Sequence, residues 1–185
     1  VNEETLPAAV AGLKTCGIRG FNLTMPNKNK IVELLDELSP EAQLIGAVNT
    51  VLNDNGKLIG YNTDGYGFMQ SVRDAGHDIT GKNITVMGVG GASMAICAQS
   101  ALDGAASVHI FARRTSRYWN RTQKFAENLS AKTGCQVCLF DNDDHTALRD
   151  SIAQSYLLIN ATSVGMVPDI DDTIIKDTSL FHPEL

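Results

Sequence analysis

The sequence has no apolar run of the ~18–20 residues that a membrane-spanning helix needs. It also has no basic excess, since 15 Lys and Arg residues are set against 21 Asp and Glu residues, for a net charge of −6. The first residues carry Glu3 and Glu4 instead of the basic stretch and apolar core of a secretory signal. With 43% hydrophobic residues, the composition excludes a disordered or collagen-like chain. These features predict a globular, cytoplasmic protein that binds neither membrane nor nucleic acid.

Cysteine is scarce, and the four residues do not form a metal-site pattern. Cys135 and Cys138 have C-x-x-C spacing, but they fall in a segment that we expect to be a strand, where residues three apart point to opposite faces. No second C-x-x-C follows, and the histidines are scattered. We therefore predict ordinary structural cysteines and no bound metal.

The length of 185 residues is compatible with one large domain or two small ones. Val1 in place of Met, and an end at Leu185 without a polar tail, lead us to expect a piece of a longer protein. Glycines at 76 and 81 predict a boundary in this region. The expected division is a first domain over 1–80 and a second domain over 81–185.

The second part alternates between strand-like and helix-like segments. Such alternation is typical of an α/β fold in which helices cover both faces of a parallel, doubly wound (Rossmann-like) sheet. The expected strands are Ile84–Met87, Val108–Ala112, Gln136–Phe140 and Tyr156–Asn160, and the expected helices are Ala92–Leu102, Arg117–Ala131 and Thr146–Ala153.

The first part has a different rhythm, typical of part of an α/β domain. Apolar residues at 31, 34, 35 and 38 predict a helix after Pro26. Asn55-Gly56 between two β-type runs predicts a hairpin. The expected strands are Ile18–Leu23, Ala47–Leu52 and Lys57–Tyr61, and the last expected helix is Asp64–Ala75.

A glycine-rich turn, Gly88-Val89-Gly90-Gly91-Ala92-Ser93, lies between an expected strand and an expected helix. One glycine permits the tight turn, another lets the backbone approach a pyrophosphate, and the helix N-terminus supplies N–H donors. Ser93 stands where the usual motif has Gly or Ala, so the match is imperfect. The turn predicts a dinucleotide site, although a tight turn that binds nothing would have a similar sequence.

The turn after the second of these strands indicates which dinucleotide is bound. NAD-binding folds place an acid there, whereas this chain has Arg113-Arg114-Thr115-Ser116-Arg117. Arginine forks suit the 2′-phosphate of NADP. We therefore predict NADP, with NAD possible; the alternative is a solvated basic turn.

Polar residues cluster where strands end in the first part. Lys28 and Asp64 are the pair that can exchange a proton with a substrate hydroxyl, and Asn49 can hydrogen-bond beside them. Each residue has a simpler alternative when taken alone. Lys28 would then be a surface lysine, Asp64 a helix N-cap and Asn49 a turn residue.

Taken together, the motifs resemble the family of shikimate dehydrogenases and shikimate/quinate dehydrogenases. The resemblance runs from Gly20 to about Leu185, in the family's order and with similar separations. It rests on Asn22-Leu23-Thr24-Met25-Pro26 with Lys28, Gly46-Ala47-Val48-Asn49-Thr50, Tyr61-Asn62-Thr63-Asp64-Gly65, the glycine-rich turn, and Asn160-Ala161-Thr162-Ser163-Val164-Gly165-Met166.

The resemblance implies reversible, NADP-dependent reduction of 3-dehydroshikimate to shikimate, a step of aromatic amino acid biosynthesis. It implies that Lys28 and Asp64 are catalytic and that Thr24, Asn49 and Asp64 bind substrate. On this resemblance, residues 1–80 are an incomplete substrate-binding domain and residues 81–185 an incomplete dinucleotide-binding domain. The implied cofactor residues are Gly88, Gly90, Gly91, Ala92, Ser93, Arg113, Arg114, Thr115, Thr162, Val164 and Met166. The implied partner is a small-molecule substrate, and the protein would be a monomer or homodimer.

Three other interpretations stay open. The doubled arginine resembles relatives that use both NAD and NADP, so a quinate/shikimate dehydrogenase of dual specificity is one alternative. A non-catalytic dinucleotide or shikimate sensor would keep the fold, but would have no need for both Lys28 and Asp64. A methylenetetrahydrofolate dehydrogenase would need a different polar set around Lys28 and has little use for Asp64.

Overall fold

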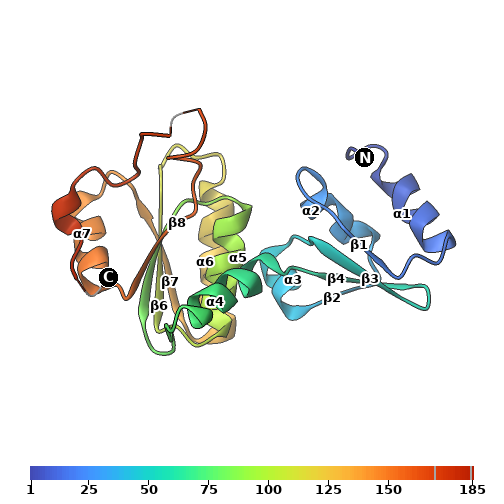
Figure 1. The fold of residues 1–185 in the computed structure, drawn as a ribbon, viewed down its shortest axis with the longest axis horizontal. Coiled ribbons are helices and arrows are strands. Elements are labelled where there is room, and N and C mark those ends of the chain that lie inside the picture. Colours follow the sequence, from blue (N-terminus) through green and yellow to red (C-terminus); the bar gives the residue numbers. More distant parts are fainter. Residues whose placement is uncertain (169, 184) are drawn as a thin grey trace. The chain divides into compact units, whose positions relative to one another are not determined.

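The computed structural model describes residues 1–168, 170–183 and 185. The chain forms two compact units, Val1–Gly67 and Phe68–Leu185, which we describe separately (Figure 1). Helix α4, Asp64–Asp74, starts in the first unit and has most of its length in the second. The predicted functional division after residue 80 stays a prediction.

The first unit is built on a four-stranded mixed sheet in the order β1-β3-β4-β2. Strands β1, β3 and β4 are antiparallel neighbours, and β2 runs parallel to β4. The elements are α1 (Leu6–Thr15), β1 (Gly20–Asn22), α2 (Asn27–Lys30), the 3₁₀ helix η1 (Ile31–Leu34), β2 (Glu37–Leu38), α3 (Pro40–Ile45), β3 (Thr50–Asp54) and β4 (Lys57–Tyr61).

The prediction of one helix reaching Leu38 is wrong. The helical stretch ends at Leu34, Leu35 is extended with φ −104° and ψ 147°, and Leu38 pairs with Gly60 in β2. The four apolar residues nevertheless all contact one core, with Ile31 fully buried. A helical spacing of apolar residues is thus satisfied by one short helix followed by an extended segment, because both place these side chains over the same sheet.

The predicted hairpin is confirmed. Asp54 pairs with Lys57 across a two-residue turn in which Asn55 and Gly56 have φ values of 53° and 92°. Positive φ at both positions is what the tight hairpin turn requires, and Asn-Gly tolerates it. The Asn53 side chain closes the turn by accepting a hydrogen bond from the Gly56 N–H at 2.8 Å.

Helices α1 and α3 were not predicted. The start and end of α3 nevertheless have ordinary sequence signals. Ser39 accepts a hydrogen bond from the Ala42 N–H, Pro40 begins the helix, and Gly46 ends it with φ 68°.

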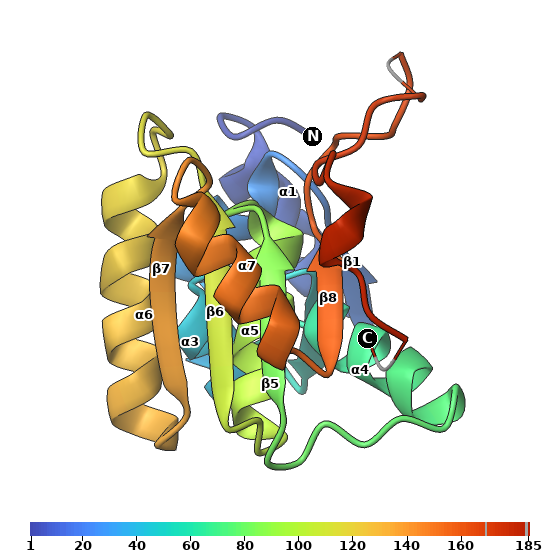
Figure 2. The same ribbon diagram turned by 90° about the vertical axis from the view of Figure 1, so that its left-hand side faces the viewer.

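The second unit is a parallel sheet in the order β7-β6-β5-β8, so the predicted α/β, doubly wound fold is confirmed. Helices α5 and α6 cover one face and α7 the other (Figure 2). The bounds lie within two residues of the prediction: β5 (Asn83–Met87), α5 (Gly91–Leu102), β6 (Ser107–Ala112), α6 (Trp119–Thr133), β7 (Gln136–Asp141), α7 (His145–Gln154) and β8 (Leu157–Asn160), followed by the 3₁₀ helix η2 (Thr178–Leu180).

The strand order places the glycine-rich turn at a particular point. After β5 the chain moves outward to β6 and β7, and then returns to β8 on the other side of β5. The carboxyl end of β5 is therefore the topological switch point, where doubly wound sheets bind their ligands. Gly88 follows directly after β5.

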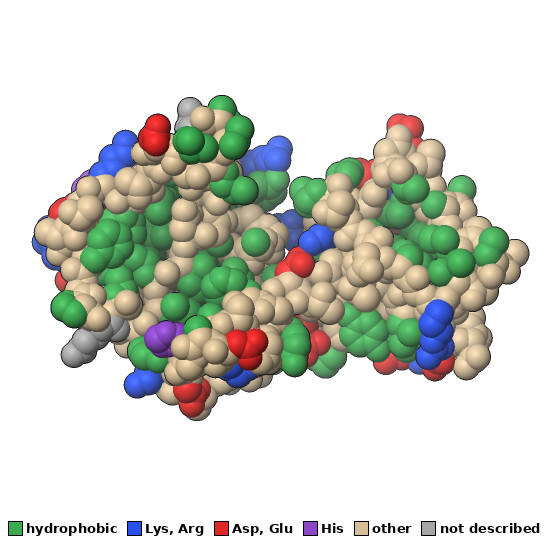
Figure 3. Space-filling model, in the orientation of Figure 1, with side chains coloured by type: hydrophobic (Ala, Val, Ile, Leu, Met, Phe, Trp, Pro, Cys, Tyr) green, Lys and Arg blue, Asp and Glu red, His purple; other side chains and the backbone are tan. Residues whose placement is uncertain are grey.

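Within the described residues, none of the helices has the length and apolar character needed to cross a membrane. On the face drawn in Figure 3, acidic and basic side chains are scattered over each unit and form no continuous basic surface.

Candidate active site

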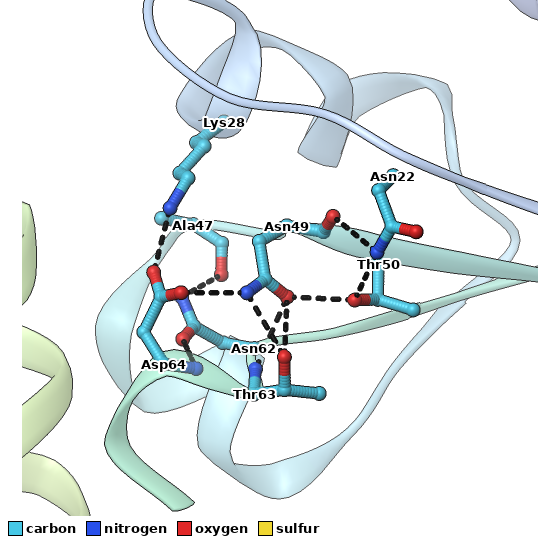
Figure 4. Close-up of polar contacts among 8 residues, drawn as sticks. All are labelled: Asn22, Lys28, Ala47, Asn49, Thr50, Asn62, Thr63 and Asp64. Atoms are coloured by element: carbon cyan, nitrogen blue, oxygen red, sulfur yellow. Dashed lines mark hydrogen bonds and ion pairs between the residues drawn. The ribbon is translucent and has the colours of Figure 1, made fainter. Parts of the chain in front are cut away.

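Lys28 and Asp64 come from different elements of the first unit and form an ion pair. Lys28 lies in α2, Asp64 begins α4, and the Lys28 Nζ to Asp64 Oδ2 distance is 2.6 Å (Figure 4). Side-chain exposure is 20% for Lys28 and 37% for Asp64, so a ligand can still reach both groups. The structure thus brings together the two residues predicted to exchange protons.

Asn49 holds the other carboxylate oxygen. Its Nδ2 donates to Asp64 Oδ1 at 2.8 Å and contacts Thr63 Oγ1 at 3.0 Å. Its Oδ1 accepts from the Thr63 N–H at 3.1 Å. Asn49 is therefore more than a turn residue, because its amide links the end of one segment to the start of α4.

The polypeptide around Asp64 is held by a second amide. Buried Asn62 donates from Nδ2 to the Ala47 carbonyl at 3.1 Å and accepts the Asp64 N–H at its Oδ1 at 3.2 Å (Figure 4). Asn62 thus satisfies the first N–H of the helix, and the Asp64 carboxylate is engaged by Lys28 and Asn49. Sequence reasoning included Asn62 in a motif without giving it this role.

Thr24 lies in the loop between β1 and α2. The loop is tied to the site by its backbone, since the Leu23 N–H donates to the Asn49 carbonyl at 2.9 Å and the Thr24 carbonyl accepts from the Asn27 N–H at 2.9 Å. The Thr24 side chain is exposed. A substrate-binding role for Thr24 stays a prediction.

In the second unit, Gly88 has a backbone that only glycine accommodates. Its φ is 114°, and a Cβ there would lie 2.9 Å from the Ala161 carbonyl oxygen and 3.0 Å from Thr162 Cγ2. The Ser93 hydroxyl donates to the Gly88 carbonyl at 2.6 Å, and Ser93 is fully buried. Ser93 therefore closes the turn with its side chain, a role that its place in the motif did not reveal.

The N-terminus of α5 is open and fits a pyrophosphate. Gly90 precedes the helix without a side-chain cap, and a Cβ at Gly90 or Gly91 would meet nothing within 4 Å. Ala92 is exposed at the same end. Uncapped N–H groups, the helix dipole and a turn without side chains together allow a phosphate to approach the backbone closely.

The segment after β8 is organised by Asn160, which the prediction did not single out. Asn160 Oδ1 accepts from the Thr162 N–H at 3.0 Å and from its hydroxyl at 2.7 Å, and Asn160 Nδ2 donates to the Val164 carbonyl at 3.1 Å. The close approach of Thr162 to Gly88 places this segment beside the glycine-rich turn. Met166 is 62% exposed.

The two adjacent arginines after β6 are held differently. The Arg114 guanidinium lies over the Trp119 ring, 4.6 Å from its centroid. Among the described residues, no side chain pairs with Arg113, and both Arg113 and Thr115 are exposed. Arg114 is thus held by stacking on the first residue of α6, whereas the Arg113 guanidinium is open to a ligand.

Two of the four cysteines are buried thiols of low reactivity. Burial raises the pKa of Cys97 to about 12 and that of Cys135 to about 11, so both remain thiols near neutral pH. Cys138 lies in β7 and Cys16 is exposed. In the part of the chain that the structure describes, no cluster of three His, Cys, Asp or Glu residues has the arrangement of a metal site.

The second unit thus has the fold of a dinucleotide-binding domain, and the first unit carries a lysine–carboxylate pair. Comparison with known proteins shows what the chain is similar to. Residues 1–51 match the family described as the shikimate dehydrogenase substrate binding domain. The predicted resemblance to shikimate and quinate/shikimate dehydrogenases is confirmed.

The similarity extends over the entire chain. It is 46% identical to shikimate dehydrogenase (NADP(+)) of Listeria innocua and 41% identical to quinate/shikimate dehydrogenase of Escherichia coli, covering 63% and 64% of those proteins. A crystal structure of shikimate 5-dehydrogenase from Listeria monocytogenes, in complex with shikimate and NAD, superposes on the whole chain with a TM-score of 0.97 and 45% identity. The chain spans 64% of that structure, just under two thirds of its relative's length.

Proposed function

We propose that the protein is an NADP-dependent shikimate dehydrogenase, which reversibly reduces 3-dehydroshikimate to shikimate in the cytoplasm. The observation that carries the proposal is the 2.6 Å Lys28–Asp64 pair held by Asn49. Its support from relatives is the 46% identity to an enzyme named shikimate dehydrogenase (NADP(+)). The 45% identical structure contains shikimate and NAD, so NAD use is included in the proposal.

In the proposed reaction, Lys28 donates a proton to the substrate oxygen during reduction and accepts it during oxidation. Asp64 orients the Lys28 ammonium through Oδ2 and accepts a hydrogen bond from a substrate hydroxyl, without taking its proton. Thr24 and Asn49 hydrogen-bond the remaining hydroxyls. A polyhydroxylated ring needs several such partners, because each buried hydroxyl left unpaired costs about 1–3 kcal/mol.

The glycine-rich turn would hold the cofactor pyrophosphate at the start of α5, and Arg113, Arg114 and Thr115 would bind the 2′-phosphate of NADP. Thr162, Val164 and Met166 would contact the nicotinamide. The bound dinucleotide supplies the hydride, and the protein supplies position and the proton. The substrate is a small molecule, and the protein acts as a monomer or homodimer.

The test is turnover by the whole protein, with shikimate and NADP, measured from the absorbance of the reduced nicotinamide. Lys28→Met is expected to lower kcat by at least ~100-fold, the usual contribution of a general acid. Lys30→Met is the matched control, because Lys30 lies in the same helix but pairs with Glu33 at 2.9 Å on the surface. Normal turnover by Lys28→Met would refute the catalytic role.

Two alternatives give different outcomes in the same assay. A quinate/shikimate dehydrogenase, the name of the 41% identical relative, would also oxidise quinate with a comparable kcat/KM. A sensor would bind shikimate and dinucleotide in calorimetry but turn over neither substrate. The Lys28–Asp64 ion pair supports an enzyme over a sensor, because a lysine held by a carboxylate can exchange a proton with a substrate hydroxyl.

A further inference from the structure

We propose that Thr50 is a positioning residue for this reaction. Its hydroxyl helps to fix the orientation of the Asn49 amide, so that the amide nitrogen, and not the amide oxygen, meets Asp64. The inference rests on the proposed function. Thr50 begins β3, directly after Asn49, and its hydroxyl donates to Asn49 Oδ1 at 2.9 Å (Figure 4). Among the described residues, the Thr50 side chain hydrogen-bonds to Asn49 and Asn22 and not to Lys28 or Asp64, so it acts through Asn49.

The direction of each hydrogen bond follows from the chemistry of its partners. An ionised carboxylate only accepts, so the atom of Asn49 at 2.8 Å from Asp64 must be the nitrogen. A backbone N–H only donates, so the atom 3.1 Å from the Thr63 nitrogen must be the Asn49 oxygen. The nitrogen and the oxygen of the amide are therefore identified from two separate contacts, and both contacts give the same orientation.

The Thr50 hydroxyl is oriented by its other neighbour. Asn22 Nδ2 lies 2.9 Å from Thr50 Oγ1 and also 3.4 Å from the Asn49 carbonyl. An amide nitrogen only donates, so Thr50 Oγ1 accepts from Asn22 and its single proton is directed to Asn49 Oδ1. The result is a one-way series of donors from Asn22 through Thr50 and Asn49 to the Asp64 carboxylate.

This order matters because the opposite orientation of the Asn49 amide would be harmful. A flipped amide would place its oxygen against the Asp64 carboxylate and its nitrogen against the Thr63 N–H. Both contacts would be repulsive, and Asp64 Oδ1 would lose its donor. Asp64 would then rotate more freely, and with it the Lys28 ammonium that it orients. Three donors hold the amide oxygen on the correct side: the Thr50 hydroxyl at 2.9 Å, the Thr63 N–H at 3.1 Å and, more distantly, the Thr63 hydroxyl at 3.3 Å.

The experiment compares Thr50→Val, which keeps the shape but removes the hydroxyl, with Thr50→Ser, which keeps the hydroxyl, in the whole protein. Thr50→Val is expected to lower kcat roughly three- to tenfold, as for loss of one hydrogen bond, while the KM for NADP stays unchanged. Thr50→Ser is expected to restore most of the parental kcat. Both variants are expected to have melting temperatures close to that of the parent. If Thr50 had only a structural role, Thr50→Val would lower the melting temperature along with kcat.

A double-mutant cycle with Asn49→Ala tests whether Thr50 acts through the amide. In that background, Thr50→Val should have no further effect on kcat, because there is no amide left to orient. Full additivity of the two substitutions, or parental kcat in Thr50→Val, would overturn the inference while leaving the proposed function intact. A parent protein with no turnover of shikimate would instead count against the proposed function.

Discussion

The candidate sites of the two units are built in opposite ways. In the first unit, the site consists of side chains that hold one another: Lys28 on Asp64, Asp64 on Asn49, and Asn49 on Thr50. In the second unit, the proposed phosphate site is a turn in which Gly90 and Gly91 leave the backbone open, and the Ser93 hydroxyl is directed at the backbone. Removing atoms should therefore damage the first site, whereas adding them should damage the second.

The largest expected effect in the second unit comes from adding one methyl group. Gly88→Ala would put a Cβ 2.9 Å from the Ala161 carbonyl oxygen at a φ of 114°. We expect the free energy of unfolding to fall by about 1–3 kcal/mol, the usual cost of such backbone strain, together with loss of dinucleotide binding. Chemical denaturation and calorimetry with NADP measure the two effects.

Gly90→Ala is the matched control. Gly90 has an ordinary extended backbone, φ −80° and ψ −179°, and its added Cβ would meet no protein atom within 4 Å. We expect parental stability but weaker NADP binding, because the methyl group would occupy the space that the pyrophosphate needs. If Gly90→Ala binds NADP as tightly as the parent, the turn does not hold the phosphates.

The same contrast explains what could be predicted from the sequence. The parallel sheet and the turn were predictable because strand, glycine and helix follow one another locally, as at Met87, Gly88 and Gly91. The Lys28–Asp64 contact joins residues 36 positions apart. The pair was predicted from its place among polar residues at strand ends, and the family resemblance then implied its catalytic role. The local spacing even misled at Leu38, where pairing with β4 prevails over helical periodicity.

Other features have no local signal at all. Ser93 appears as a motif mismatch, yet its hydroxyl bonds the Gly88 carbonyl, five residues earlier. Asn160 and Asn62 stand within predicted motifs, but their roles depend on backbone groups that approach only after folding. The structure shows that these amides bond the backbone, but a single sequence does not predict this role.

A smaller effect separates the two arginines after β6. Arg113→Ala is expected to raise the KM for NADP far more than that for NAD, because a guanidinium recognises the 2′-phosphate that only NADP carries. Arg114→Ala should act in the same direction and also lose the stacking of Arg114 on Trp119. Steady-state kinetics with both dinucleotides provide the measurement, and equal changes in the two KM values would contradict the NADP assignment.

Trp119→Leu tests the contribution of this stacking separately. It removes the ring beneath Arg114 and leaves both guanidinium groups in place. If stacking positions Arg114, the KM for NADP should rise by less than in Arg114→Ala, and the KM for NAD should change little. A larger effect of Trp119→Leu than of Arg114→Ala would mean that the ring, which is 8% exposed, matters mainly for packing.

The smallest expected effect concerns a polar cluster in the second unit that supports the fold. His109 Nδ1 lies 2.8 Å from Ser151 Oγ, which is 2.6 Å from Thr85 Oγ1, and the imidazole packs edge-on against Phe140. Burial lowers the pKa of His109, so the folded state resists protonation more than the unfolded state does.

The sign of the pH dependence follows from that direction. Above the ordinary histidine pKa of about 6.5, neither state is protonated and the stability is fully present. As the pH falls from there toward the lower pKa of the folded state, the unfolded state binds more protons and the free energy of unfolding decreases. His109→Gln should therefore flatten the fall in melting temperature between about pH 7 and pH 5. Parallel slopes in the parent and His109→Gln would contradict the assignment of this pH dependence to His109.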